Sequence, residues 1–426
     1  MLRFAQSPTT DMSIEDLRIV LLNYIVAKQK KEDLIVRIED TDKHKNIEGK
    51  DQEILDILGL FGITHSQVIY QSQNFKFHSA MALQLLHEKK AFACFCSVAW
   101  LQNKRQEAKA ANKTYNYDDA CRNLPAELVI DNTNPFTIRI NRPDEPIVID
   151  DRIKGKVTFS PDKVDSFVIM HQDKTPTYNF ACAVDDMLSD ISIIICSEEQ
   201  INNSPKQEHV RNTLGYNKKI EYAHLPSFSK KESSDLLSVK RLLEEGYLPE
   251  AISNYLISTC YEAPKELFTL EEVVEWFTLD RVSKNPTHFD IDRLKHINKE
   301  YLKAMQAKEL SRYVGFADAE IGELARLYLD EVNTTLELKS KIMPIFEKRN
   351  IPKKFEEQAV LISKTIKTAP YFEEYDDFKD YLIKETGVKE KYLVNLLYLL
   401  LTNAEHGPDI SKVYKYLKNY LMEIIK

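Results

Sequence analysis

Glycine is scarce in this sequence: 10 of the 426 residues are glycine. Nucleotide-binding loops use glycine for tight turns and for close approach of the backbone to phosphate, so this scarcity argues against an ordinary glycine-rich phosphate loop. Hydrophobic residues still make up 43% of the chain, which is enough for large cores. A chain of this length suits about two to four domains.

Long apolar runs and a secretory leader are also missing. No 18 consecutive residues are apolar, and the opening letters MLRFAQSPTT place no charged segment before an apolar one, so we expect no membrane partner. With 6 cysteines we expect no disulfide scaffold and a reducing, cytoplasmic location. The net charge of −8 argues against general nucleic-acid binding but leaves room for a local basic face.

The hydrophobic pattern divides the chain by texture. Residues 1–90 alternate strand and helix, residues 91–185 are mixed, and residues 186–245 return to alternation. From about residue 246 helical periodicity dominates to the end. This order predicts an α/β Rossmann-type domain with an α+β insertion, followed by an all-α C-terminal half.

The stretch RFAQSPTTDMSIEDLR, from Arg3 to Arg18, predicts a strand, a polar turn and a helix that begins near Ile14. A turn of this kind normally offers backbone N–H groups and a helix N-terminus to an anion. This one carries Glu15 and Asp16 in the first helical turn. These carboxylates would repel a phosphate, whereas they complement the helix dipole.

The order of five strings along the chain indicates a protein family. The strings are RFAQSPT, LIVRIEDTD, DKTPTYNFACAVDD, NNSPKQEHVR and SVKRLLEEGYLPEAISNYLI. In that order they resemble the bacterial glutamyl-tRNA synthetases, a class I family, and the resemblance covers nearly the whole chain. It implies a Rossmann catalytic domain at 1–90 and 186–245, split by an acceptor-binding insertion at 91–185. It further implies a stem-contact region at 246–300, a helical anticodon-binding-like domain at 301–426, and a monomer.

The family chemistry joins glutamate to tRNA(Glu) in two steps that use ATP with Mg²⁺. ATP and glutamate first form glutamyl-adenylate, and a hydroxyl of the terminal tRNA adenosine then takes the glutamyl group. Two family signatures hold the triphosphate, a His-Ile-Gly-His-like tetrapeptide and a Lys-Met-Ser-Lys-like loop. A third, Arg-Gly-Glu-Asp-His, supplies an arginine that helps to bind the substrate carboxylate.

The first signature is degenerate, with Ser13 in place of histidine and Glu15 in place of glycine. Glu15 adds a side chain where adenine should lie and a negative charge near the phosphates. At ~4 Å and an effective dielectric constant of ~20, a unit charge pair is worth about 4 kcal/mol, or roughly three powers of ten in affinity. The structural interpretation is that Ser13 caps the helix and Glu15 complements its dipole.

The other two signatures are also changed. The loop that should hold the lysine signature has Lys230 and Lys231 as its only cations, which either contact phosphate as point charges or belong to a solvated surface loop. Cys196 stands in place of the family arginine, and a thiol cannot replace its bidentate recognition of a carboxylate. Cys196 is either a reactive thiol or a buried structural residue, and we favour the structural role.

Five other positions match family residues near the amino acid and the adenosine: Arg3, Ser7, Glu39, Tyr178 and Asn179. Together with Cys196 they are the candidate substrate-binding residues. The structural alternative is that an Arg–Glu pair and a tyrosine hydroxyl lock the domain together. The sequence leaves both interpretations open.

Cys94, Cys96 and Cys121 resemble the zinc-binding cysteines that some family members carry in the insertion. Three thiolates and a fourth ligand suit tetrahedral zinc. The fourth ligand is unclear, because Asn123 stands where some members have histidine and Tyr117 is a poor ligand. Zinc is therefore the minority interpretation.

A basic cluster in the helical half, FEKRNIPKK, contains Lys348, Arg349, Lys353 and Lys354. Such a cluster beside aromatic residues could follow the anticodon stem of tRNA(Glu). The alternative is a solvated helix end, which is what charge runs usually form.

The sequence leaves two functions and a third class of function open. We favour a catalytically impaired or inactive paralogue that retains tRNA binding, because the changes concentrate at the sites for phosphate and carboxylate. The alternative is an active glutamate–tRNA ligase with an unusual active site, which would use ATP with Mg²⁺. A small-molecule sensor or a different adenylating enzyme is the third class.

Overall fold

The computed structural model describes residues 1–113, 115–229 and 238–425. They form two compact units. The first comprises Met1–Val239, Leu256–Pro264 and Phe268–Phe289, and the second comprises Lys240–Tyr255, Lys265–Leu267 and Asp290–Lys426. Among the described residues, no helix is long and apolar enough to cross a membrane.

A seven-stranded sheet forms the centre of the first unit, in the order β3-β2-β1-β9-β10-β6-β7. The strands are β1 (Leu2–Gln6), β2 (Leu34–Ile38), β3 (Gln67–Tyr70), β6 (Ile147–Asp151), β7 (Gly155–Phe159), β9 (Ile193–Ser197) and β10 (Glu221–Leu225). All neighbours are parallel except β6 and β7, which are antiparallel. The strand order reverses between β1 and β9, and ligands of open α/β sheets bind at such a switch point.

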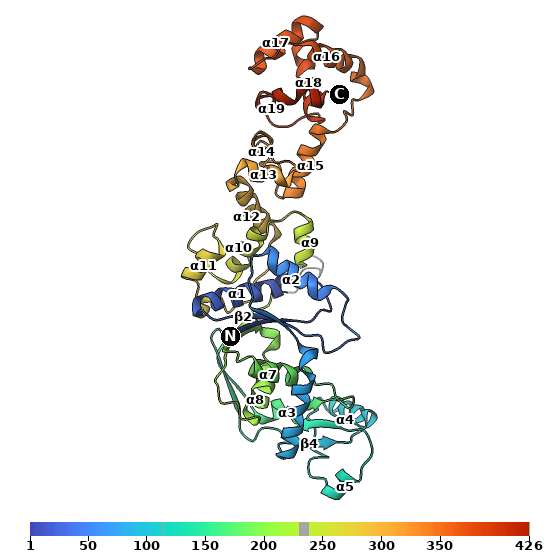
Figure 1. The fold of residues 1–426 in the computed structure, drawn as a ribbon, viewed down its shortest axis with the longest axis vertical. Helices are drawn as coiled ribbons and strands as arrows, with labels where there is room; N and C mark the ends of the chain where they lie inside the picture. The colour runs from blue at the N-terminus through green and yellow to red at the C-terminus, as the bar shows by residue number, and fades with distance from the viewer. Residues whose placement is uncertain (114, 230–237, 426) are drawn as a thin grey trace. The chain divides into compact units, whose positions relative to one another are not determined.

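Local sequence explains these elements. The strand β2 reads LIVRI and is buried throughout, as expected for a parallel strand with helices on both faces. Helices α1 (Ile14–Lys30) and α2 (Lys50–Leu60) lie on one side of the sheet, and α7 (Tyr178–Leu188) and α8 (Ser204–Thr213) lie on the other (Figure 1). The Rossmann-type fold expected for the first half is therefore confirmed.

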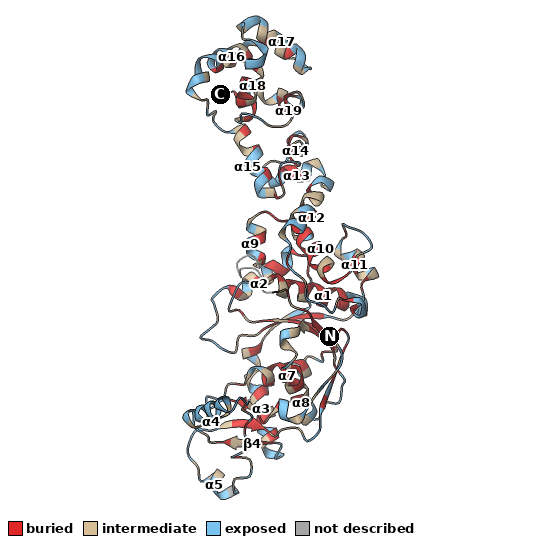
Figure 2. Cartoon of the chain, turned by 180° about the vertical axis from the view of Figure 1, so that it is seen from behind, coloured by how far each residue is buried: buried red, intermediate tan, exposed pale blue. Residues whose placement is uncertain are grey.

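A second, three-stranded antiparallel sheet follows the order β4-β5-β8. Its strands are β4 (Ala91–Cys94), β5 (Thr137–Ile140) and β8 (Val168–Met170), and the helices near it in the chain are α3 (Phe75–His87), α4 (Val98–Ala110), α5 (Ala126–Ile130) and α6 (Pro161–Val164). No residue of α4 is buried, and this helix is largely exposed in Figure 2. Because β6 and β7 pair into the large sheet, residues 91–185 contribute to both sheets, not to one separate insertion.

The second unit is helical, as the periodicity predicts, and its described residues include no strand. The helices of the C-terminal half are α9 (Val239–Glu244), α10 (Pro249–Cys260), α11 (Leu270–Trp276), α12 (Ile291–Ala304), α13 (Ala307–Tyr313), α14 (Ala319–Arg326), α15 (Thr335–Phe346), α16 (Glu356–Thr368), α17 (Tyr375–Thr386), α18 (Glu390–Thr402), α19 (Ile410–Leu417) and α20 (Leu421–Ile424). The expected stem-contact region at 246–300 is shared between the two units, since α11 belongs to the first and α12 to the second.

One glycine permits close helix packing in the second unit. A Cβ atom on Gly322 would lie 1.8 Å from the carbonyl oxygen of Ala307, so α14 and α13 approach each other at a distance that only glycine allows.

Candidate active site

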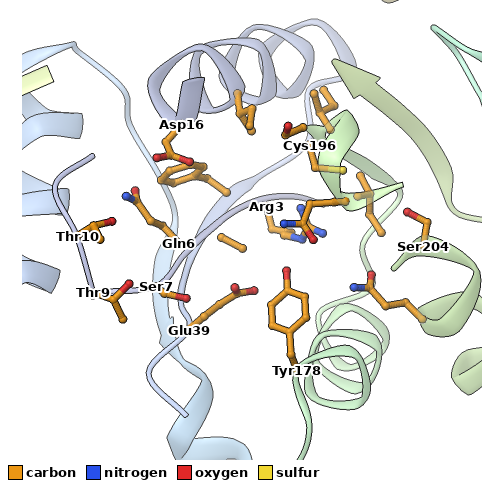
Figure 3. A pocket seen from close by; sticks show the side chains of 18 residues that line it. Arg3, Gln6, Ser7, Thr9, Thr10, Asp16, Glu39, Tyr178, Cys196 and Ser204 are labelled. Atoms are coloured by element: carbon orange, nitrogen blue, oxygen red, sulfur yellow. The ribbon is translucent and has the colours of Figure 1, made fainter. Parts of the chain in front are cut away.

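A cavity of about 320 Å³ opens where the carboxyl ends of β1, β2 and β9 meet (Figure 3). Five of the six candidate substrate-binding residues line it: Arg3, Ser7, Glu39, Tyr178 and Cys196. The sixth, Asn179, lies beside it and accepts a hydrogen bond at 3.3 Å from Gln207, which does line the cavity. The switch point of the sheet thus gathers residues from three distant parts of the chain.

The charged side chains at the base of this cavity form one buried network. Nε of Arg3 donates to Oδ1 of Asp186 at 3.2 Å, and Nη1 of Arg37 donates to the same oxygen at 2.5 Å. Nη2 of Arg37 donates to Oε1 of Glu39 at 3.0 Å. Burial opposes ionisation of Asp186, but Arg3, Arg37 and Arg211 outweigh it and lower the pKa of Asp186 to about 2. The network fixes an arginine and a glutamate at the cavity, which suits a ligand that carries both a carboxylate and an ammonium group.

The remaining polar wall of the cavity combines neutral groups with one further carboxylate, that of Asp16. Tyr178 directs its hydroxyl into the cavity, and the nearby Glu39 and Cys182 together with burial raise the pKa of Tyr178 well above its usual value (Figure 3). Cys196 contributes its side chain to the same wall. Among the described residues that line the cavity, Arg3 is therefore the only cation.

The start of helix α1 is capped by its own side chains. Oδ2 of Asp16 accepts hydrogen bonds from the backbone N–H of Ser13 at 3.1 Å and from the Ser13 hydroxyl at 2.7 Å. The N–H of Asp16 in turn donates to Oγ of Ser13 at 3.1 Å, which completes a capping box. The donors that a phosphate would need at this helix end are thus partly used within the helix.

Glu15 links the start of α1 to the turn after β10 by a hydrogen bond. Its Oε1 accepts a hydrogen bond from the backbone N–H of Phe228 at 2.6 Å. Arg18 donates to the carbonyl oxygen of Pro226, and its guanidinium lies 4.4 Å from the centre of the Phe228 ring. Burial raises the pKa of Glu15, and the hydrogen bond from Phe228 partly offsets this effect. Lys230 and Lys231, the two predicted loop cations, lie outside the described residues.

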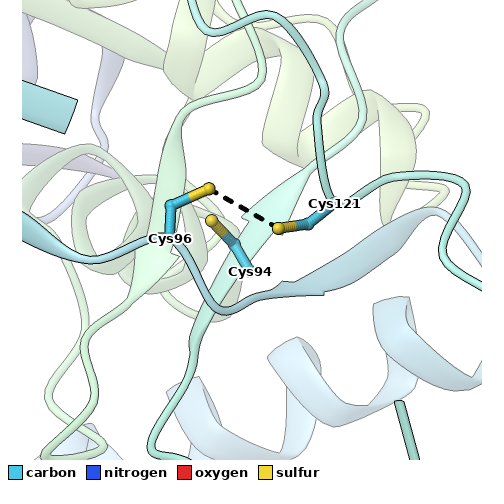
Figure 4. Close-up of side chains that lie close together, drawn as sticks. All are labelled: Cys94, Cys96 and Cys121. Carbon is cyan, nitrogen blue, oxygen red and sulfur yellow. Dashed lines mark hydrogen bonds between the residues drawn. The ribbon is translucent and has the colours of Figure 1, made fainter. Parts of the chain in front are cut away.

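The three insertion cysteines come together (Figure 4). The Sγ atoms of Cys94, Cys96 and Cys121 all lie within 4.8 Å of one another, and those of Cys96 and Cys121 are 3.5 Å apart. Oη of Tyr117 lies 3.4 Å from Sγ of Cys94 and 3.3 Å from Sγ of Cys96, so this tyrosine takes the fourth position of the cluster. Asn123, the other candidate for that position, is exposed.

The cysteine cluster fits a tetrahedral metal ion in size and chemistry. Zn–S bonds of about 2.3 Å in a tetrahedron place sulfur atoms a little under 4 Å apart, close to the spacing observed. Although burial opposes the thiolate form, hydrogen bonds from Tyr117, the backbone of Cys96 and Arg139 lower the pKa of Cys94 to about 7. Burial and the neighbouring thiols raise the pKa of Tyr117, which therefore keeps its proton without a metal. The three thiols are the natural ligands, and the phenol is the available fourth group.

The basic cluster of the helical half is not uniform. Lys348, Lys353 and Lys354 are exposed, as phosphate contacts require. Arg349 is instead directed into the protein, where its guanidinium donates to the carbonyl oxygens of Leu400 and Ile345, both at 2.6 Å. It also donates to Pro344 and Glu347, and burial lowers its pKa to about 10. Arg349 thus caps the end of α15 and ties it to α18, a structural role that replaces the predicted phosphate contact.

Sequence reasoning missed a buried chain of polar groups next to the cavity. Nδ1 of His224 lies 2.5 Å from Oδ2 of Asp151, and Nε2 of His224 lies 2.8 Å from Oγ of Ser204. Ser204 lines the cavity, whereas His224 is completely buried. These residues stand on three separate elements, so no local spacing could have revealed them. The nearest signal was the string SPKQEH, which marks Ser204 only as a helix start.

Comparison with known proteins agrees with this geometry. The family described as tRNA synthetases class I (E and Q), catalytic domain, matches residues 1–296. Over the full length of both chains, the sequence is 62% identical to glutamate–tRNA ligase 2 of Sulfurimonas denitrificans and 46% identical to glutamate–tRNA ligase 1 of Nitratiruptor sp.. The fold is similar to the crystal structure of a glutamate tRNA ligase from Elizabethkingia meningosepticum in complex with its amino acid, with a TM-score of 0.81, 23% identity, and 100% and 98% of the two chains covered.

Proposed function

The chain belongs to the family of class I tRNA synthetases (E and Q), and from this premise we propose a glutamate–tRNA ligase-like protein that retains tRNA binding but activates glutamate with ATP poorly. One observation carries this proposal: the carboxylate of Glu15, at the start of α1, accepts a hydrogen bond from the backbone N–H of Phe228. This carboxylate stands where the family signature has a glycine.

The electrostatics of this helix start oppose a triphosphate. Glu15 and Asp16 place two carboxylates in the first turn, and the capping box uses N–H groups that would otherwise face an anion. One unrelieved unit charge at ~4 Å is worth about 4 kcal/mol at an effective dielectric constant of ~20. Burial raises the pKa of Glu15 and so favours its protonated form, which does not repel a phosphate.

The amino-acid cavity supports weak binding of glutamate. Arg3 and Glu39 are positioned for a carboxylate and an ammonium group by their ion pairs with Asp186 and Arg37. Cys196 supplies no guanidinium for a second carboxylate. A dicarboxylic amino acid therefore has one cationic partner in this cavity where the family pattern has two.

The names of the relatives favour a second candidate, an active glutamate–tRNA ligase. The proteins at 62% and 46% identity over the whole chain are both named as ligases. In that case ATP with Mg²⁺ is the cofactor and tRNA(Glu) the second substrate. The exposed Lys348, Lys353 and Lys354 supply cations for tRNA in both candidates. A structural zinc ion would be held by Cys94, Cys96, Cys121 and Tyr117. Such an ion would stabilise the fold of this segment and take no part in catalysis.

The two candidates are separated by ATP binding and by charging. We expect titration calorimetry to give a dissociation constant for ATP-Mg²⁺ weaker than about 1 mM, in the ordinary range of weak binding. We also expect no glutamyl-tRNA in a filter assay with tRNA(Glu), and retained tRNA binding in a fluorescence anisotropy titration. Submillimolar ATP binding together with charging would establish the active ligase instead.

A further inference from the structure

Cys196 has a histidine as its neighbour in the sheet. It pairs in register with His224 on the adjacent parallel strand, so both side chains leave the same face. Against the effect of burial, Asp151 and then Cys196 raise the pKa of His224 to about 9. Cys196 is half-buried and lines the cavity, so a ligand there can meet the thiol.

Asp151 holds this histidine in one orientation. Its Oδ2 accepts hydrogen bonds from Nδ1 of His224 at 2.5 Å and from the backbone N–H of His224 at 2.9 Å. The other oxygen accepts from the N–H groups of Ile153 at 2.8 Å and Lys154 at 2.6 Å. Nδ1 of the imidazole therefore carries a proton, and Nε2 lies 2.8 Å from Oγ of Ser204. A nucleophile, a base and a buried carboxylate that orients the base are the parts of covalent acyl-transfer sites.

The cavity also contains a polar atom that needs a partner. Gln6 lines the cavity and is 7% exposed, and its Oε1 has no hydrogen-bond partner among the residues that the structure describes. An unpaired buried acceptor calls for an N–H group on a ligand. With Arg3 for a carboxylate, Glu39 for an ammonium group and no second cation, the lining fits an α-amino acid whose side chain ends in a neutral carboxamide. A volume of about 320 Å³ accommodates such a molecule.

We propose that Cys196, His224 and Asp151 form a nucleophilic site that hydrolyses the side-chain carboxamide of a small α-amino acid. The reaction shares the cavity with the function proposed above, but it needs neither ATP nor tRNA and does not depend on that function.

The chemistry balances with water as the only co-reactant. The Cys196 thiolate forms a C–S bond to the carboxamide carbon, and the C–N bond breaks as His224 gives its proton to the departing nitrogen, which leaves as ammonia. Water then attacks the thioester carbonyl, with His224 as the base that takes its proton. The C–S bond breaks, the side-chain acid is released and the thiolate is restored beside the imidazolium.

Ser204 is the competing nucleophile, because its hydroxyl lies 2.8 Å from Nε2 of His224. It is 3% exposed, and a serine hydroxyl depends on a neutral histidine to remove its proton. Cys196 is instead half-buried, lines the cavity and pairs in register with His224, so a ligand meets its thiol more readily than the buried hydroxyl. Ser204 therefore positions the imidazole.

The test measures ammonia released from L-glutamine, and separately from L-asparagine, by the purified full chain without ATP or tRNA. We expect release above the buffer rate from one of the two amino acids. Cys196→Ala abolishes it, His224→Gln lowers it by about 100-fold or more, and Ser204→Ala retains most of it. The matched control is His209→Gln, which changes a histidine whose Nε2 lies 2.6 Å from the carbonyl oxygen of Asn141 and leaves the rate unchanged.

No release by the wild type from either amino acid, or an equal rate in Cys196→Ala, overturns the proposal. Loss in Ser204→Ala with retention in Cys196→Ala assigns the nucleophile to serine and overturns it as well.

A second measurement does not depend on turnover or on the stability of any histidine variant. Iodoacetamide labels the six free cysteines, and mass spectrometry after short exposure compares their rates. We expect Cys196 to be alkylated at least about 10-fold faster than the exposed-thiol rate set by free cysteine at about pH 7, because the neighbouring imidazole of His224 activates the thiol as a nucleophile. A rate at or below that of free cysteine overturns the activated thiol.

Discussion

The helix start at residues 13–16 and the proposed amino-acid cavity both lie at the carboxyl end of β1, but their charged side chains have different partners. At the helix start, carboxylates are bound by the protein's own N–H groups, from Ser13 and Phe228. In the cavity, Arg3 and Glu39 are held by buried partners and still face the open space. The proposed phosphate site is thus closed by the protein's own hydrogen-bond donors, whereas the proposed amino-acid site keeps an arginine and a glutamate that line the cavity.

The largest effect should come from breaking the cavity network. Asp186→Ala removes a completely buried carboxylate and leaves Arg3 and Arg37 without their shared partner. We expect a loss of about 3–5 kcal/mol in the free energy of unfolding, measured by urea denaturation. The control is Asp190→Ala, which breaks an exposed ion pair with Lys218 and should cost less than about 1 kcal/mol. Similar losses in both variants would show that the network is not what holds the cavity.

The next effect comes from reopening the helix start. The triple substitution Ser13→His, Glu15→Gly and Asp16→Asn removes both carboxylates, and ATP-Mg²⁺ should bind more tightly by up to roughly three powers of ten in titration calorimetry. Charging of tRNA(Glu) should remain absent, because Cys196 still lacks the guanidinium. Restored charging would mean that the helix start alone separates this chain from an active ligase.

The buried pair of His224 and Asp151 should make stability depend on pH. Interactions with Asp151 and Cys196 raise the pKa of His224 from 6.5 to about 9 despite its burial. A raised pKa in the folded state stabilises the protein fully below about pH 6.5, and this contribution is lost as the pH rises through about 9. The loss should be on the order of 3 kcal/mol, measured by urea denaturation between about pH 6.5 and 9. In His224→Gln the same slope should disappear, and a slope equal to that of the wild type would assign it to other groups.

The smallest effect per residue concerns the basic cluster. Charge reversal of Lys348, Lys353 and Lys354 should weaken tRNA binding, and the dependence of log affinity on log salt should become shallower by about 0.7 to 0.9 for each phosphate that the cluster no longer neutralises. The matched control reverses three exposed lysines of neighbouring helices, Lys364, Lys367 and Lys384, at the same net charge. Anisotropy at two salt concentrations compares the variants. Equal weakening in both would mean that net charge, and not the cluster, attracts tRNA.

Arg349 shows why the sequence alone could not distinguish the exposed cations of the basic cluster from the one bound within the protein. A run of basic residues looks uniform in one dimension, but the fold brings the carbonyl oxygen of Leu400 within 2.6 Å of its guanidinium. Tyr117 is a second example, because its hydroxyl reaches Cys94 only where the loop that contains it returns to the end of β4. In both cases the deciding interaction joins residues whose distance along the chain carries no signal.

Local interactions were accessible from the sequence because they act within a few residues. The strand–helix alternation of the first half, the helical second half, and the cap formed by Ser13 and Asp16 all follow from hydrophobic period and three-residue spacing. Only the tertiary structure decided that β6 and β7 join the large sheet, and that Asp151, at the end of β6, orients His224 beside Cys196. Pairing between distant strands is chosen by the burial of whole faces, which no short window of sequence contains.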